Sequence, residues 1–120
     1  MAAIRGEGTI ELQLDSRVEG IWTILDVAGE VDLSTAPSLR DELNSLVESG
    51  TRKLVVNLEQ VGFMDSSGLG VLVAGLKRLK EAGGEMALVC RDGPTLKVLA
   101  ITGLDRVFPI HPSVADALAP

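Results

Sequence analysis

The sequence predicts an α/β fold in which a mixed, largely parallel β-sheet with an N-terminal hairpin packs against about four α-helices. Two strand-like segments come first, three pairs of helix-like and strand-like segments then alternate, and a final helix follows. Glycines or prolines lie near most boundaries between these segments. The 120 residues, 46% of them hydrophobic, suffice for one domain whose core needs no metal or disulfide.

The first two strands are predicted to form a hairpin. Residues 9–14 alternate between apolar and polar side chains, with Ile10, Leu12 and Leu14 as the apolar set, which indicates a half-buried strand. Glu19-Gly20 is a turn sequence, and the apolar run of residues 21–27 follows it as the second strand.

The first helix is predicted to begin at Ser34 or Thr35, since such residues cap helices and Pro37 suits the first turn. Gly50 is expected to end this helix. Its buried stripe consists of the apolar residues at helical spacing, which are Ala36, Leu39, Leu43, Leu46 and Val47.

The remaining elements alternate between strands and helices. In the run 85–90, residues 86–90 are all apolar, which is typical of a central strand buried on both faces, whereas the short run 107–110 is expected at an edge. Gly83-Gly84 and Gly103 are expected to end the helices that precede them. Strands are expected at 53–58, 85–90 and 107–110, and helices from the serines to about residue 82, from 94 to about 100, and at 113–119.

Function is expected where the strand 53–58 passes through a short loop into the next helix. This junction carries Asp65, Ser66 and Ser67. Ligands and partners of α/β folds gather on loops at the carboxyl ends of strands. A helix that begins here directs backbone N–H groups and a positive dipole end toward the serines, so an added phosphate is compatible with the fold. The alternative is that Asp65 or Ser66 only caps the helix.

Two glycines in the first turns of this helix need a further explanation. Gly68 and Gly70 each cost roughly 0.5 to 1 kcal/mol relative to alanine inside a helix. Their positions therefore predict either close packing of the helix on the sheet or an open surface for docking.

The same helix is predicted to have a buried face and an apolar outer face. Val71, Ala74 and Gly75 lie opposite the buried face and carry no charge, so this surface is a hypothetical docking site for a protein partner. The face expected to cover the sheet consists of Leu69, Leu72, Val73, Leu76 and Leu79.

Composition excludes several classes of protein. The formal net charge is −6 and the aromatic residues are two phenylalanines and one tryptophan, which argues against direct nucleic-acid binding. No segment resembles a signal peptide or a membrane span, so we expect a soluble, cytoplasmic protein without membrane insertion. Cys90 ends an apolar run and is interpreted as a buried strand thiol.

The motifs of common enzymes are missing, so no catalytic residue, metal or cofactor is expected. His111 is the only histidine and lies between prolines, where it is interpreted as a solvated turn residue rather than as the base of a serine hydrolase. Asp32 and Asp65 could together bind magnesium, although carboxylates at turns more often cap or remain solvated.

Three stretches of the sequence resemble the bacterial anti-sigma-factor antagonists, which are single STAS domains. These are Gly29 to Ala36, Asn57 to Gly70 with its Met-Asp-Ser-Ser-Gly-Leu-Gly core, and Gly83-Gly84. The resemblance runs from about residue 9 to 118, and the serine loop is its specific part. It implies a single STAS domain over residues 1–120 with a core at about 9–118.

The resemblance also implies a phosphorylation switch. Ser66 corresponds to the serine that an anti-sigma factor, itself a serine kinase, phosphorylates in that family, and Ser67 to a supporting residue. The unmodified protein binds the anti-sigma factor and releases a sigma factor, phosphorylation ends binding, and a serine phosphatase restores it. Asp32 matches an acidic position near the phosphosite.

Our leading hypothesis combines this switch with the apolar helix face. The phosphate adds about −1.5 to −2 charges beside Asp65, which repels a docked partner. The alternatives are an adaptor of a membrane transporter or stress-signalling assembly, and an enzyme that uses Ser66 as a nucleophile. The protein is expected to be a monomer or weak dimer. The expected partner-binding residues are Asp32, Asp65, Ser66, Ser67, Gly68, Leu69, Gly70, Val71 and Ala74.

Overall fold

The computed structural model describes residues 11–120, which form a five-stranded sheet in the order β1-β2-β3-β4-β5. β1 runs antiparallel to β2, and every other neighbouring pair is parallel. The predicted mixed, largely parallel sheet with an N-terminal hairpin is therefore confirmed. The strands are β1 (Gln13–Glu19), β2 (Trp22–Val31), β3 (Lys53–Met64), β4 (Glu85–Val89) and β5 (Ile110–His111).

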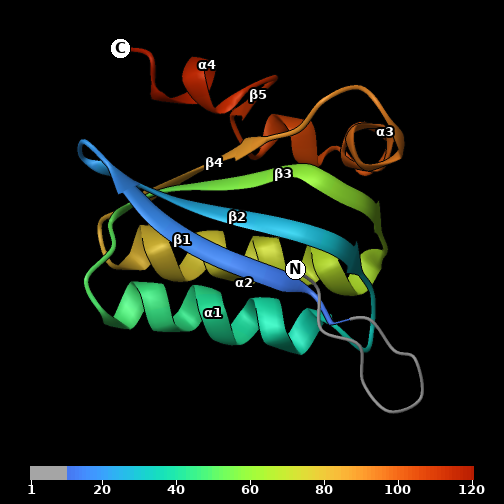
Figure 1. The fold of residues 1–120 in the computed structure, drawn as a ribbon, viewed down its shortest axis with the longest axis horizontal. Helices are drawn as coiled ribbons and strands as arrows, with labels where there is room; N and C mark the ends of the chain where they lie inside the picture. The colour runs from blue at the N-terminus through green and yellow to red at the C-terminus, as the bar shows by residue number, and fades with distance from the viewer. Residues whose placement is uncertain (1–10) are drawn as a thin grey trace.

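Helices cover both faces of this sheet. Two long helices lie side by side beneath one face, and the chain crosses to the other side of the sheet after β4 (Figure 1). The helices are α1 (Ala36–Glu48), α2 (Ser66–Glu81), α3 (Pro94–Ile101), the 3-10 helix η1 (Leu104–Arg106) and α4 (Val114–Leu118). No helix within residues 11–120 has the length and apolar character needed to cross a bilayer.

Alternation along the strands divides the core into two parts. Leu25 and Val56 belong to the larger cluster, which includes the buried residues of α1 and α2. Their neighbours Ile24 and Val55 point the other way and belong to a smaller cluster with Ala117 of α4. Burial on both faces explains why residues 86–90 are all apolar, and β4 indeed lies between β3 and β5.

The hairpin confirms the predicted turn but shifts the first strand. Glu19 pairs with Trp22, and Gly20 adopts a φ of 64°, a left-handed conformation that favours glycine. Within the described residues β1 covers Gln13–Glu19 and extends past the predicted end at residue 14, because its pairing with β2 continues without interruption to the turn. Leu12 and Leu14 are half-buried as predicted, whereas residues 9 and 10 lie outside the described residues.

β2 and β3 are both longer than predicted. Two register irregularities interrupt their pairing, yet Glu30 still pairs with Phe63, and Val31 with Met64. The expected loop between residue 58 and the serines is therefore mostly strand, and Asp65 alone separates β3 from α2. This extension places the start of α2 directly beside the end of β2.

The C-terminal elements are shorter than predicted. β5 consists of Ile110 and His111, so the prediction of a strand at 107–110 is correct in its edge position but early in its start, because the N–H groups of Val107 and Phe108 donate to the carbonyl oxygen of Leu104 and form a turn after η1. His111 is half-buried in this strand rather than solvated in a turn. Ser113 caps α4, as its hydroxyl oxygen accepts a hydrogen bond from the Asp116 N–H at 3.1 Å.

Candidate functional site

The carboxyl ends of β2 and β3 bring two polar loops together. The backbone N–H of Asp65 donates a hydrogen bond to the carbonyl oxygen of Val31 over 3.1 Å. Asp32 follows Val31 directly, so the start of the β2–α1 loop lies against the start of α2. The structure thus places Asp32 near Asp65 and Ser66.

Asp65 is the cap of α2. Its Oδ1 accepts hydrogen bonds from the backbone N–H groups of Ser67 at 2.8 Å and Gly68 at 3.4 Å. The capping role that we considered for Asp65 or Ser66 therefore belongs to Asp65. Ser66 occupies the first helical position and is exposed, and its hydroxyl makes no hydrogen bond to any group in residues 11–120. Ser67 is half-buried.

The two early glycines of α2 have different explanations. A Cβ atom added at Gly68 would lie 2.6 Å from Cγ1 of Val31 and 2.7 Å from Cγ of Met64, so a side chain there would separate the helix from the sheet. The same atom at Gly70 would meet nothing within 4 Å. Close packing explains Gly68, whereas Gly70 is exposed and has no packing requirement in the described structure.

Asp32 organises the loop next to the serine. Its Oδ1 accepts hydrogen bonds from the Ser34 hydroxyl at 2.7 Å, from the Ser34 N–H at 2.9 Å and from the Thr35 N–H at 3.0 Å. These hydrogen bonds hold the pKa of Asp32 below its usual value, and the bond from the Ser34 side chain has the largest effect. The carboxylates of Asp32 and Asp65 each accept hydrogen bonds from backbone N–H groups that follow them in the sequence. This is the capping role that was given above as the alternative to joint magnesium binding.

The outer face of α2 differs from the prediction. Gly75 is buried, with its Cβ position 3.0 Å from Cδ1 of Leu43 on α1, and Val71 packs half-buried against the core. Arg78, one turn further, donates a hydrogen bond to Asn44 of α1 at 2.5 Å. Val71 and Gly75 therefore face α1, and their assignment to the outward face was wrong because α1 packs against that side.

The exposed side of α2 continues from Ser66. We call Ser66, Gly70, Val73 and Ala74 the α2 outer strip, since all four are exposed and recur at helical spacing. Val73 is 40% exposed, so its predicted place on the buried face was also wrong, whereas the four leucines of that face are buried. Leu69 is 8% exposed and Gly68 is buried, so both lie beneath the surface.

Two exposed apolar residues near the site were missed by the sequence analysis. Leu33, which follows Asp32, is 79% exposed, and Phe63, which precedes Met64 at the end of β3, is 46% exposed. Leu33 could have been recognised from the sequence, because it is a large apolar residue among the polar residues that precede a predicted helix. Phe63 could not be found in this way, because the length of β3 was underestimated.

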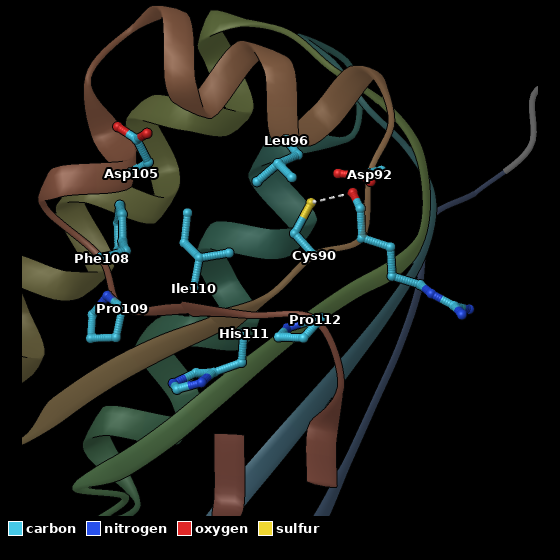
Figure 2. Close-up of a pocket in the computed structure, with 10 residues that line it drawn as sticks. Cys90, Asp92, Leu96, Asp105, Phe108, Pro109, Ile110, His111 and Pro112 are labelled. Atoms are coloured by element: carbon cyan, nitrogen blue, oxygen red, sulfur yellow. Dashed lines mark hydrogen bonds between the residues drawn. The ribbon is translucent and has the colours of Figure 1, made fainter. Parts of the chain in front are cut away.

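A pocket elsewhere in the described structure is separate from this site. It has a volume of about 720 Å³ and lies where β4 and β5 end, between α3 and η1 (Figure 2). Its lining includes Cys90 and His111 but none of the expected partner-binding residues. Cys90 is buried as predicted, and burial raises the pKa of its thiol. A thiol in this state is a poor nucleophile.

Comparisons with known proteins show the family of this chain. A family model described as the STAS domain matches residues 10–117. The anti-sigma-B factor antagonist of Staphylococcus aureus (strain NCTC 8325 / PS 47) is 34% identical over 102 residues, which are 85% of this chain and 94% of that protein.

Solved structures show the same relationship. An anti-sigma factor antagonist from Mycobacterium paratuberculosis superposes with a TM-score of 0.84 at 31% identity, covering 90% of this chain and 92% of that one. The Bacillus cell fate determinant SpoIIAA in its phosphorylated form has a TM-score of 0.67 at 25% identity, covering 89% and 96%. The chain therefore belongs to the STAS domain family.

Proposed function

We propose that this protein is an anti-sigma-factor antagonist that binds an anti-sigma factor serine kinase and loses this binding when Ser66 is phosphorylated. The observation that carries the proposal is that Asp65 and Ser66 have different roles at the start of α2. Asp65 caps the helix, while the neighbouring Ser66 hydroxyl is exposed and has no hydrogen-bonding role in residues 11–120. A kinase can therefore modify Ser66 without removing an interaction that stabilises the fold.

The location of Ser66 also suits a phosphate. It is the first residue of a 16-residue helix, where the helix dipole favours negative charge. The N–H groups of Ser67 and Gly68 already bind Asp65, so the phosphate would share this end of the helix with a carboxylate. The modified site would carry about three negative charges in a small area, of which the phosphate supplies about −1.5 to −2.

The rest of the α2 outer strip explains why such charge would end binding. Gly70, Val73 and Ala74 are exposed, small or apolar, and uncharged. A partner that docks on them would enclose the added phosphate at the interface, where an unpaired charge costs roughly 3 to 5 kcal/mol. A thousandfold loss of affinity requires only about 4 kcal/mol, so no large conformational change is needed.

The same geometry supports a regulatory role rather than an enzymatic one. Ser66 follows β3, whereas His111 lies on β5, with β4 between them. Two strand spacings correspond to roughly 10 Å, which is beyond hydrogen-bond reach of the serine. We therefore propose that the chain is a cytoplasmic regulator without catalytic activity, and that a separate serine phosphatase restores binding.

The test is to combine the protein with its cognate anti-sigma factor kinase and ATP, map the phosphorylated residue by mass spectrometry and measure complex formation by calorimetry. Ser66→Ala should bind the kinase and resist the switch, whereas the matched control Ser67→Ala should be phosphorylated and released. Phosphorylation of Ser67 instead, or phosphorylation of Ser66 without loss of binding, would overturn the proposal.

A further inference from the structure

Among residues 11–120, β1 has no neighbouring strand along its outer edge. The strand has seven residues, pairs with β2 without a register irregularity and ends the strand order on its side. In Figure 1 its outer edge carries no further strand or helix from the described residues. Every second residue of such an edge directs its backbone N–H and C=O groups away from the sheet, where another strand can bind them.

The sequence of this strand is complementary to itself. Around Ser16 it reads leucine, aspartate, serine, arginine and valine at positions 14–18. If two copies of β1 pair antiparallel about Ser16, Asp15 of each copy lies opposite the partner's Arg17, and Leu14 lies opposite the partner's Val18. Opposite charges and apolar pairs directly across from each other stabilise antiparallel strands.

Asp15 has no cationic partner among residues 11–120. It pairs in register with Asp26 on β2, so two carboxylates lie directly opposite each other. Arg17 is bonded elsewhere, with its Nε 2.8 Å from Oδ2 of Asp26 and its Nη1 bonded to Glu19. Within residues 11–120, Asp15 has no ion pair. A guanidinium has five N–H donors, so a partner's Arg17 can keep these contacts and also bind Asp15.

We propose that this protein forms a homodimer in which two β1 strands pair antiparallel about Ser16 and join the sheets into one of ten strands. Val18, which is 72% exposed in the single chain, is then covered by the partner's Leu14. Shifting the register by two residues in either direction places Asp15 opposite Asp15 or Arg17 opposite Arg17. Charge therefore selects the register centred on Ser16.

This dimer leaves the serine sites free. The two copies run in opposite directions, and Ser66 follows the carboxyl end of β3, so the two serine loops lie at opposite ends of the joined sheet. The dimer is independent of the proposed function but gives it two binding sites per particle. A contact of one short strand with another is small for a protein interface, so we expect weak, concentration-dependent association.

Sedimentation equilibrium of the full chain, from micromolar to millimolar concentration, tests the proposal by a charge swap. Asp15→Arg places an arginine opposite the partner's Arg17 and should weaken dimerisation about tenfold or more. Arg17→Asp should weaken it similarly, and the combined swap Asp15→Arg with Arg17→Asp should restore it. Glu81→Arg makes the same charge change at the exposed end of α2 and should dimerise like the unmodified protein.

Thermal unfolding of each variant shows whether the variant is folded. A change in the association of a folded variant can then be assigned to the interface. Asp15→Arg should fold normally, because the new arginine lies opposite Asp26. An unmodified protein that stays monomeric throughout the range would overturn the proposal. So would dimers that Asp15→Arg leaves unchanged, a folded double swap that does not regain association, or a Glu81→Arg variant that is weakened as much as Asp15→Arg.

Discussion

The N–H of Asp65 donates its hydrogen bond to the carbonyl oxygen of Val31, over 3.1 Å, and so ties the junction of β3 and α2 to the end of β2. Asp65 thereby has two structural roles, since its backbone joins the loops and its side chain caps α2. The next residue, Ser66, is exposed.

Asp65→Ala should lower the free energy of unfolding by about 1 kcal/mol, because the cap of α2 is lost. Asp65→Asn should cost much less, since an asparagine side chain also caps helices well. Urea unfolding of both variants checks this. Equal stability of the alanine variant and the unmodified protein would show that the Asp65 side chain does not stabilise the helix.

The two early glycines of α2 should respond in opposite directions to alanine. Gly68→Ala should destabilise the fold by about 1 to 3 kcal/mol, because the new methyl group meets Val31 and Met64. Gly70→Ala should stabilise it by about 0.5 to 1 kcal/mol, as the site is open and alanine favours helix. If Gly70 is present to let the partner approach closely, the same variant should bind the anti-sigma factor more weakly. Unfolding curves and calorimetry measure these effects.

Val71 and Val73 are adjacent in sequence but should behave differently when each is replaced by lysine. Val73→Lys should leave stability within about 0.5 kcal/mol, as is usual for surface changes, and weaken anti-sigma factor binding. Val71→Lys should mainly destabilise the fold, because Val71 packs against the core beside α1. Unchanged binding by a folded Val73→Lys variant would show that the α2 outer strip is not the docking surface.

The hydrogen bonds to Asp32 predict a pH dependence of stability. Its folded-state pKa is lowered, chiefly by the Ser34 side chain and the Thr35 N–H, below the unfolded value of about 3.9. The carboxylate therefore stabilises the fold above that value, and this contribution is lost as pH falls through the lower folded-state pKa. The stability difference between the unmodified protein and Asp32→Ala should shrink in acid. Urea unfolding over this pH range measures it, and a difference that stays constant would contradict the assignment.

Local sequence signals predicted where turns and helices begin better than they predicted which elements pack side by side. Glu19-Gly20 and Pro37 mark a turn and a helix start by backbone chemistry alone, and both were placed correctly. The full length of β3 was missed, because residues 59–64 extend as a strand only through their pairing with the end of β2. The orientation of α2 was also partly wrong, since Val71 and Val73 are equally apolar and only the position of α1 distinguishes them.

The serine site shows the same limit. The carboxyl end of a strand and the polar residues after it indicated where the site lies, but two candidate caps remained. Only the geometry separates Asp65, whose carboxylate accepts the helix N–H groups, from Ser66, whose hydroxyl is exposed. Leu33 and Phe63 became visible as exposed neighbours of the site once the ends of β2 and β3 were known.

The most direct measurement compares the dissociation constants of the unmodified and Ser66-phosphorylated forms for the same anti-sigma factor, determined by calorimetry. The proposed switch predicts tight binding by the unmodified form and an affinity lower by about a thousandfold after phosphorylation, equivalent to about 4 kcal/mol. Equal dissociation constants for the two forms would contradict it.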